Sequence, residues 1–285
     1  MRVEALGPDR GAEPGIAAVG GIHGDEPCGV RAIERFVEEG PTDLLRRPVT
    51  LVVANERALG AGERYVDADL NRVFPGDPGG DRHEERLAAA LLSELDDAFT
   101  LGFHSTISFD EPFGTLADLT PRKARIMRAL PLAHAADFTG VVEGRSVNLP
   151  GFVNVEAGRQ GTDAAAENAY DCLLAYLRVT DALPGDPGAT PTTLYHVSDV
   201  IEKEPGREYR FEGENFARVP AGGVYARSVD GEHVLRAGSD LWPVLMSADG
   251  HERLLGYTAT AAEPLAESVP APAGETSGFT DRSGG

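Results

Sequence analysis

Apolar stretches alternate with amphipathic stretches from residue 16 to about residue 180, and this alternation limits the folds open to the chain. The apolar stretches are short and unbroken, which is typical of buried strands, and the stretches between them place apolar residues on one helical face. Strands that alternate with helices favour a mixed, mostly parallel sheet flanked by helices. The predicted strands are Ile16–Ile22, Val49–Ala54, Phe99–Phe103, Phe138–Val142 and Phe152–Val155, and the predicted helices are Val30–Glu38, Glu84–Phe99, Arg122–Ala133 and Asp163–Arg178.

The chain changes character after this α/β part, which we expect to span residues 1–182. Residues 183–191 are rich in Pro, Gly and Asp, as linkers are. Residues 192–262 contain short apolar runs between Gly and Asp turns, which predicts a small all-β domain. Residues 263–285 are rich in Pro, Ala, Ser, Gly and Glu and are predicted to be a disordered tail. The predicted strands of the second domain are Leu194–Ile201, Asn215–Val219, Gly223–Arg227, His233–Leu235, Leu241–Met246 and Arg253–Thr260.

The composition limits both the location and the partners of the protein. Its 285 residues include 46 acidic and 26 basic side chains, a net charge of −20, and a field of that sign repels nucleic acid and anionic membranes. No apolar run reaches the ~18 residues that span a bilayer. The N-terminus lacks the basic start of a signal peptide, and two cysteines make no disulfide framework. We therefore expect a soluble cytoplasmic protein.

The distribution of charge also suggests where the protein works. Acidic residues are spread over the whole chain, and only Lys123 and Lys203 are lysines. This pattern favours a surface adapted to high salt, where screening removes self-repulsion. An acidic interaction surface is the alternative, although such surfaces usually come as concentrated blocks.

A candidate metal site begins in the Gly-rich turn after the first predicted strand. His23 and Glu26 lie in this turn, at the carboxyl end of the strand, where open α/β sheets bind their ligands. An imidazole and a carboxylate are two ligands of a catalytic zinc, which takes three protein ligands and keeps one position open. The alternative is a polar turn whose side chains only cap the next helix.

His104 offers the third ligand, because it follows another apolar strand, Phe99–Phe103. If the two strands are neighbours in a parallel sheet, His104 and His23 emerge at the same edge. Two histidines and a glutamate form the ligand set of zinc peptidases and deacylases. A lone His104 would more simply bond a backbone carbonyl, but with the first pair in view we favour one zinc ion per chain.

A long polar segment, residues 60–82, has no periodicity and predicts a functional loop. Its Arg64, Asn71 and Arg72 suit a bidentate grip on a substrate carboxylate. The alternative is a solvated polar loop. Asp67 and Asp69 in this loop are expected to be helix or turn caps.

Glu156 ends the apolar strand Phe152–Val155, where burying a carboxylate is costly unless it has a partner or a task. Beside a zinc site it could take the proton of the attacking water and pass it to the leaving amine. The alternative is a strand-end glutamate in a salt bridge.

Five motifs, in this order, resemble the succinylglutamate desuccinylase/aspartoacylase family, which belongs to the zinc carboxypeptidase-like folds. They are His23-Gly-Asp-Glu26, Asn55-Glu-Arg-Ala, Arg64-Tyr-x-Asp-x-Asp-Leu-Asn71-Arg72-x-Phe, His104-Ser-Thr and Val-Glu156-Ala-Gly. The resemblance covers roughly residues 14 to 180. It implies zinc on His23, Glu26 and His104, with Glu156 as general base and then acid. It also implies that Arg64, Asn71 and Arg72 hold substrate carboxylates and help polarise the scissile carbonyl.

The resemblance implies two further features, and the chain departs from the family's pattern at other positions. Arg145 resembles the family's arginine shortly before the catalytic glutamate, and the β-rich segment would cover the active-site mouth. Asp25 stands where the family commonly has Asn, and the tyrosine found near Arg145 in aspartoacylases has no counterpart. Neither Tyr257 nor His251 aligns with the family's substrate-contacting tyrosine.

These features together predict a zinc-dependent amidohydrolase that removes the acyl group of a small N-acyl amino acid. A carboxypeptidase-like peptidase is one alternative, and a non-catalytic metal- or metabolite-binding member is another. An exposed sheet edge could support a homo-oligomer.

Overall fold

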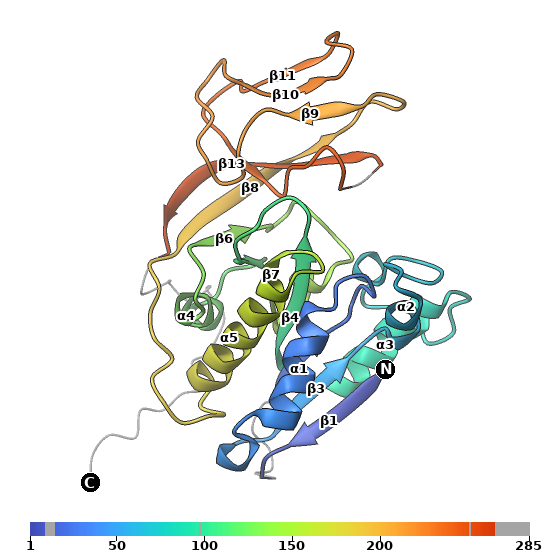
Figure 1. The fold of residues 1–285 in the computed structure, drawn as a ribbon, viewed down its shortest axis with the longest axis vertical. Coiled ribbons are helices and arrows are strands. Elements are labelled where there is room, and N and C mark those ends of the chain that lie inside the picture. Colours follow the sequence, from blue (N-terminus) through green and yellow to red (C-terminus); the bar gives the residue numbers. More distant parts are fainter. Residues whose placement is uncertain (9–14, 97, 251, 266–285) are drawn as a thin grey trace.

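The computed structural model describes residues 1–8, 15–96, 98–250 and 252–265. The strands form a ten-stranded sheet and a separate three-stranded sheet, and helices flank the larger sheet (Figure 1). The predicted mixed α/β fold is therefore confirmed. None of the helices in these ranges is both long and apolar enough to cross a membrane.

The larger sheet contains strands from both the N-terminal and the C-terminal parts of the chain. In spatial order its strands are β1 (Arg2–Leu6), β3 (Val49–Val53), β2 (Ile16–Gly20), β4 (Phe99–Thr106), β7 (Phe152–Arg159), β5 (Phe113–Leu116), β6 (His134–Asp137), β8 (Thr193–Glu202), β13 (Leu254–Pro264) and β12 (Trp242–Val244). The strands β3, β2, β4 and β7 run parallel to one another. Parallel strands expose their carboxyl ends at one edge of the sheet. The turn that follows β2 and the last residues of β4 and β7 therefore come together there.

Two apolar cores lie on opposite faces of these parallel strands. Side chains of α1 (Cys28–Glu39), α4 (Pro121–Ala129) and α5 (Asp163–Val179) pack on one face, which includes Ile16 and Leu101. Side chains of α3 (His83–Leu95) pack on the other. Strands buried on both sides read as unbroken apolar runs, which explains why they were visible in the sequence.

The β-rich C-terminal segment continues the larger sheet. Its first strand, β8, pairs in parallel with β6, and β13 and β12 follow. The smaller sheet contains β11 (Val234–Arg236), β10 (Val224–Ser228) and β9 (Tyr209–Phe211), and the C-terminal strands gather at one end of the molecule (Figure 1). The domain boundaries at residues 182 and 192 stay a prediction. The predicted tail, apart from residues 263–265, lies outside the described residues.

Several predicted elements are wrong in place or length. The predicted strand Phe138–Val142 is not a strand, because the sheet uses β6, four residues earlier. Phe138 and Val142 are apolar because they pack against the C-terminal strands, in a cluster that includes Tyr257. The helix predicted to reach Phe99 ends at Leu95, since Asp96 adopts a left-handed backbone conformation at φ 42°.

Other elements were missed. Strands β1, β5 and β9 were not predicted, nor was the short helix α2 (Glu56–Ala61) at the start of the polar loop. Asn215–Val219 forms no strand, and only Val219 makes a bridge, to Leu241. Three 3₁₀ turns complete the described fold: η1 (Thr42–Leu44), η2 (Leu70–Arg72) and η3 (Ser146–Asn148).

Candidate metal and active site

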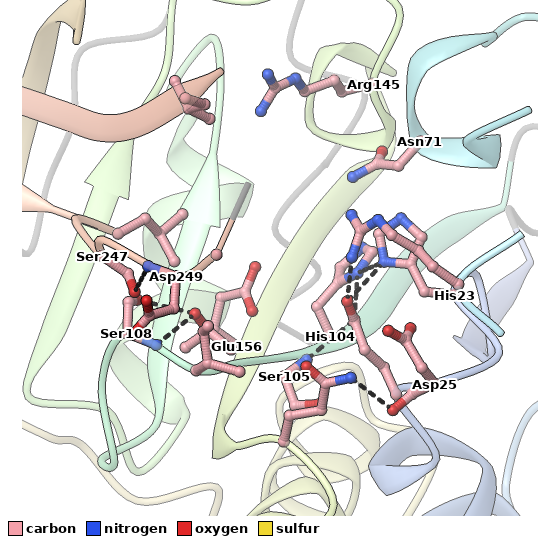
Figure 2. Close-up of a pocket in the computed structure, with 18 of the residues that line it drawn as sticks. His23, Asp25, Asn71, His104, Ser105, Ser108, Arg145, Glu156, Ser247 and Asp249 are labelled. Carbon is pink, nitrogen blue, oxygen red and sulfur yellow. Dashed lines mark hydrogen bonds and ion pairs between the residues drawn. The ribbon is translucent and has the colours of Figure 1, made fainter. Parts of the chain in front are cut away.

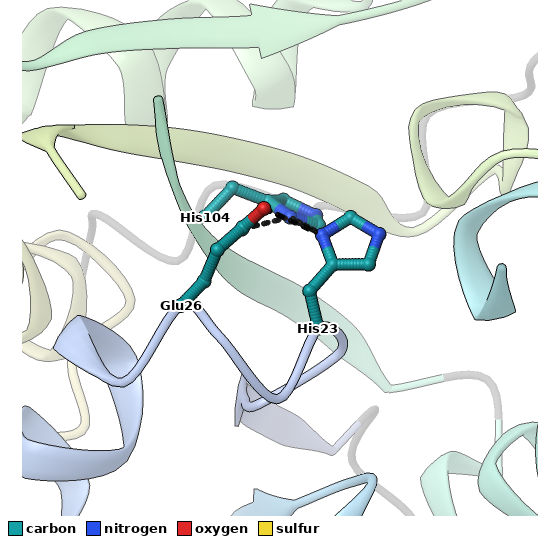
Figure 3. Close-up of side chains that lie close together, drawn as sticks. All are labelled: His23, Glu26 and His104. Atoms are coloured by element: carbon teal, nitrogen blue, oxygen red, sulfur yellow. Dashed lines mark hydrogen bonds and ion pairs between the residues drawn. The ribbon is translucent and has the colours of Figure 1, made fainter. Parts of the chain in front are cut away.

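The turn between β2 and α1 carries His23 and Glu26, and its tight path depends on glycine. A Cβ atom on Gly24 would lie 2.1 Å from the backbone carbonyl carbon of Ala58 in α2. Only glycine allows this approach. The turn is therefore pressed against α2, and both side chains are directed toward β4, where His104 lies (Figure 3).

His23, Glu26 and His104 converge in a buried cluster. Nδ1 of His23 lies 2.8 Å from Glu26 Oε1, Nδ1 of His104 lies 3.0 Å from Glu26 Oε2, and the two Nδ1 atoms are 3.3 Å apart. The three residues are at most 3% exposed. In the described part of the chain, this is the one group of three or more such residues that could hold a metal ion.

The donor set and its spacing fit zinc. Ligand bonds of about 2.0–2.1 Å to a tetrahedral zinc ion separate neighbouring ligand atoms by about 3.3 Å. The observed separations of 2.8–3.3 Å are of this size. Each of the three residues offers one ligand atom, and these atoms all lie within 4.8 Å of one another. Two imidazoles with one carboxylate leave a fourth position of a tetrahedral zinc ion open.

Asp69 holds His23 in this arrangement. Nε2 of His23 donates to Asp69 Oδ1 at 3.0 Å, which leaves Nδ1 facing the other two candidate ligands. Such a carboxylate partner commonly fixes the ring orientation of a metal-binding histidine. Asp69 also accepts from Asn71 N at 2.9 Å and from Arg64 Nε at 3.1 Å. It is thus a turn cap, as predicted, but its contact with His23 was missed.

Glu26 is fixed from both sides. Its Oε1 accepts from Arg64 Nη1 at 2.9 Å, and its Oε2 accepts from Ser105 N at 3.1 Å. Burial raises the pKa of this carboxyl, but the two histidines lower it more, and the pKa lies well below its usual value. The carboxylate is therefore ionised and held in one orientation.

Glu156 lies on β7, directly beside His104 in the register of the sheet. It lines the cavity next to the three candidate ligands (Figure 2). Within the described ranges it forms no ion pair, so the salt-bridge alternative finds no partner there. Burial and the nearby Glu26 carboxylate raise the pKa of the Glu156 carboxyl to about 8.

A cavity of about 330 Å³ opens in front of these residues. The predicted Arg64, Asn71, Arg72 and Arg145 all line it. Asn71 Oδ1 accepts from Ser146 N at 2.8 Å, and Phe74 N donates to the carbonyl of Gly144 at 3.1 Å. These two bonds tie the polar loop to the turn that carries Arg145.

The arginines differ in how far they are neutralised. Arg64 bonds Glu26 and Asp69, as described above. Arg72 donates to the carbonyl of Asn71 at 2.7 Å and stands 3.9 Å from Asp69. Arg145 has no carboxylate partner among the described residues, and its guanidinium lies 5.6 Å from the ring centre of Tyr257. Burial and the charge of Arg145 lower the pKa of Arg72.

The C-terminal segment also contributes to the wall of the cavity. Leu245, Ser247, Asp249, Leu254 and Tyr257 line it. Tyr257 is 2% exposed, and its hydroxyl has no hydrogen-bond partner in the described structure. No sequence pattern singles out Tyr257, since it lies in an ordinary apolar strand. His251 lies outside the described residues.

Part of the chain is similar in sequence to known proteins. Residues 12–110 match the succinylglutamate desuccinylase/aspartoacylase catalytic domain. A probable aspartoacylase of Acaryochloris marina is 33% identical over 103 residues, which are 32% of this chain and 34% of that protein. The N-acyl-aromatic-L-amino acid amidohydrolase (carboxylate-forming) B of Danio rerio is 41% identical over 66 residues, 22% of this chain and 21% of that protein. These matches span about a third or less of the length of these curated relatives.

The likeness in fold extends beyond this segment. The crystal structure of a succinylglutamate desuccinylase/aspartoacylase from Rhodobacter sphaeroides superposes with a TM-score of 0.72 at 21% identity, over 92% of this chain and 88% of that one. The C-terminal strands therefore belong to the shared fold. The sequence match over residues 12–110 agrees with the family resemblance drawn from the motifs, and the structural match shows that the chain shares the fold of the Rhodobacter sphaeroides protein.

Proposed function

We propose that the chain is a zinc-dependent hydrolase that cleaves the amide bond of a small N-acyl amino acid. The observation that carries this proposal is the buried His23–Glu26–His104 cluster beside a Glu156 carboxyl that has no ion-pair partner in the described structure. The names of the relatives point in the same direction, because they include an aspartoacylase and an N-acyl amino acid amidohydrolase.

His23, Glu26 and His104 would hold one zinc ion per chain. Zinc bound there would supply a Lewis acid for the amide carbonyl and a more acidic water at neutral pH. Asp69 and Arg64 would keep two of these ligands in place through the bonds described above. Arg64 also lines the cavity, and its guanidinium would help to polarise the scissile carbonyl.

Glu156 would act as general base and then as general acid. It accepts a proton from the water that attacks the carbonyl carbon, and it gives this proton to the amine nitrogen as the C–N bond breaks. Burial and the Glu26 carboxylate raise the pKa of Glu156 in the metal-free site, and the charge of a bound zinc ion would lower it toward neutrality, where a carboxyl can both take and give a proton. The products are a carboxylic acid and a free amine.

Arg72, Arg145, Asn71 and Tyr257 would bind the substrate carboxylate. Arg145 lacks a carboxylate partner among the described residues, and the Tyr257 hydroxyl lacks any partner there. A ligand carboxylate would satisfy both. The cavity volume of about 330 Å³ suits a small acyl amino acid. The C-terminal residues that line the cavity take up space that an extended peptide would need, which favours a small substrate over a peptide.

The direct test is release of free amine from a panel of N-acyl amino acids, with zinc added and salt kept high. Wild-type protein is compared with Glu156→Gln, which keeps the shape of the side chain but cannot take a proton. We expect turnover of at least one substrate, reduced about 10²- to 10⁴-fold in the variant. Metal analysis should give one zinc per chain in both proteins. Glu167→Gln, an exposed change on α5, is the matched control and should leave turnover unchanged.

Other results would reject the proposal. Hydrolysis of blocked dipeptides without turnover of any acyl amino acid would favour the peptidase. Stoichiometric zinc with no turnover of either class would favour a binding protein.

A further inference from the structure

A second buried carboxylate, Glu84, lies outside the cavity and is not used in the mechanism above. It belongs to the first turn of α3 and is 0% exposed. A fully buried carboxylate is costly unless all of its lone pairs are occupied. Its partners therefore indicate what it does.

Four N–H donors surround the Glu84 carboxylate. Oε1 accepts from Val66 N at 2.7 Å and from Asn55 Nδ2 at 3.0 Å. Oε2 accepts from Asp67 N and Ala68 N, each at 3.0 Å. Three of the donors are consecutive backbone groups, so this part of the loop forms a concave anion site that the protein fills with its own side chain.

The segment bound by Glu84 lies between the two loop residues that support the candidate metal ligands. Arg64, two residues before it, bonds Glu26, and Asp69, directly after it, bonds His23. Asn71 and Arg72 follow in the η2 turn. Glu84 thus fixes the backbone from which all four of these side chains extend.

Asn55 connects the same carboxylate to the metal turn. It is fully buried, and its Oδ1 caps α2 by accepting from Ala58 N at 3.2 Å. Helix α2 is the element against which Gly24 packs. The turn with His23 and the loop with Arg64 are therefore both held in relation to Glu84.

We propose that Glu84 is a positioning residue that fixes residues 64–72 of the polar loop, so that the arginines of this segment meet the substrate. The part of this inference that concerns catalysis rests on the proposed function, whereas the ordering of the loop does not. Only glutamate meets the geometry. Glutamine would direct an NH₂ group at two N–H donors, or at one N–H and the Asn55 amide, and aspartate is one methylene too short to reach all four.

The test uses the full chain with the substitution Glu84→Gln, and Tyr176→Phe as a control. Tyr176 is also fully buried, and its hydroxyl donates to the carbonyl of Phe99 at 2.5 Å, away from the loop. Both substitutions remove buried hydrogen bonding and lower the melting temperature. We expect Glu84→Gln to reduce kcat/KM about tenfold or more, mainly by raising KM, while the KM of Tyr176→Phe stays at the wild-type value.

Amide hydrogen exchange supplies a readout that needs no activity. In Glu84→Gln the amides of Val66, Asp67 and Ala68 should exchange at least about tenfold faster, while in Tyr176→Phe they should remain protected. Glu84→Asp, which keeps the charge, should lie between wild type and Glu84→Gln, and it replaces Glu84→Gln if that protein does not fold.

The outcomes separate the inference from the proposed function. Unchanged exchange at residues 66–68 in Glu84→Gln, or an equal rise of KM in Tyr176→Phe, would overturn the inference. Faster exchange with no wild-type turnover of any acyl amino acid would support the ordering role while the proposed function fails.

Discussion

Replacing Tyr257 with phenylalanine should stabilise the protein and weaken its substrate binding at the same time. The Tyr257 side chain is 2% exposed, and its hydroxyl has no partner in the described structure. A buried hydroxyl without a hydrogen bond costs about 1–3 kcal/mol. Tyr257→Phe removes that oxygen atom alone. We therefore expect the free energy of unfolding to rise by about 1 kcal/mol, which corresponds to an increase in Tm of about 2–4 °C.

The effect on binding has the opposite sign. In the proposed function the hydroxyl donates to the substrate carboxylate beside Arg145, and its ring already lies 5.6 Å from that guanidinium. A hydrogen bond to a charged group contributes about 1.5–3 kcal/mol. Losing it should raise KM about tenfold to a hundredfold, with kcat changing much less.

Tyr176→Phe is again the matched comparison. The same atom is removed from an equally buried tyrosine, but here the hydroxyl donates to Phe99 O. This variant should lose about 1 kcal/mol of stability and keep its KM. Thermal unfolding of the zinc-free proteins and amine release by the zinc-loaded proteins measure the two effects. The reasoning is refuted if Tyr257→Phe is destabilised as much as Tyr176→Phe, or if its KM is unchanged.

Two further predictions concern charge. Raising KCl from about 0.01 M to about 1 M shortens the Debye length from about 30 Å to about 3 Å. Because this screens the self-repulsion of a net charge of −20, the Tm should rise over this range. An unchanged Tm would contradict salt adaptation. Burial raises the pKa of Glu84, but its N–H donors lower it more, so its pKa lies below the usual value. Its contribution to stability is therefore present above the unfolded pKa of about 4.3 and is lost as pH falls through the folded pKa. In denaturant unfolding, the stability difference between wild type and Glu84→Gln should shrink from pH 6 to pH 3, and a constant difference would contradict this assignment.

The candidate ligands could be found from the sequence because their placement follows from local rules. His23 and Glu26 share one turn, so their proximity needs no knowledge of the fold. His104 required the order of the strands, and β4 does lie next to β2 in the same direction. In a parallel sheet the carboxyl ends then meet at one edge. The strand β4 runs on to Thr106, so His104 lies within it rather than after it.

The supporting residues could not be found in this way, because their roles depend on contacts between distant segments. Glu84 looks like an ordinary acidic residue in the first turn of a helix, and only the fold brings three loop amides to it. Tyr257 reaches the cavity because β13 joins the larger sheet through β8. The same joining explains the misplaced strand at Phe138, whose apolar character serves contacts with these later strands.

The carboxylate partners of the arginines show which arginines order the site and which could bind the substrate. The sequence motifs show this less clearly. Acidic side chains outnumber basic ones by 46 to 26, so an arginine in this chain readily finds a carboxylate. Arg64 lies in such a pair with Glu26 and so orders the site. Arg145 is partly buried and has no carboxylate partner among the described residues. Its positive charge lowers the pKa of the neighbouring Arg72. Natural proteins depart from the usual pairing of buried charges where function requires it. The positive charge of Arg145, unpaired among the described residues and close to Arg72, is therefore where an anionic substrate would gain the most binding energy.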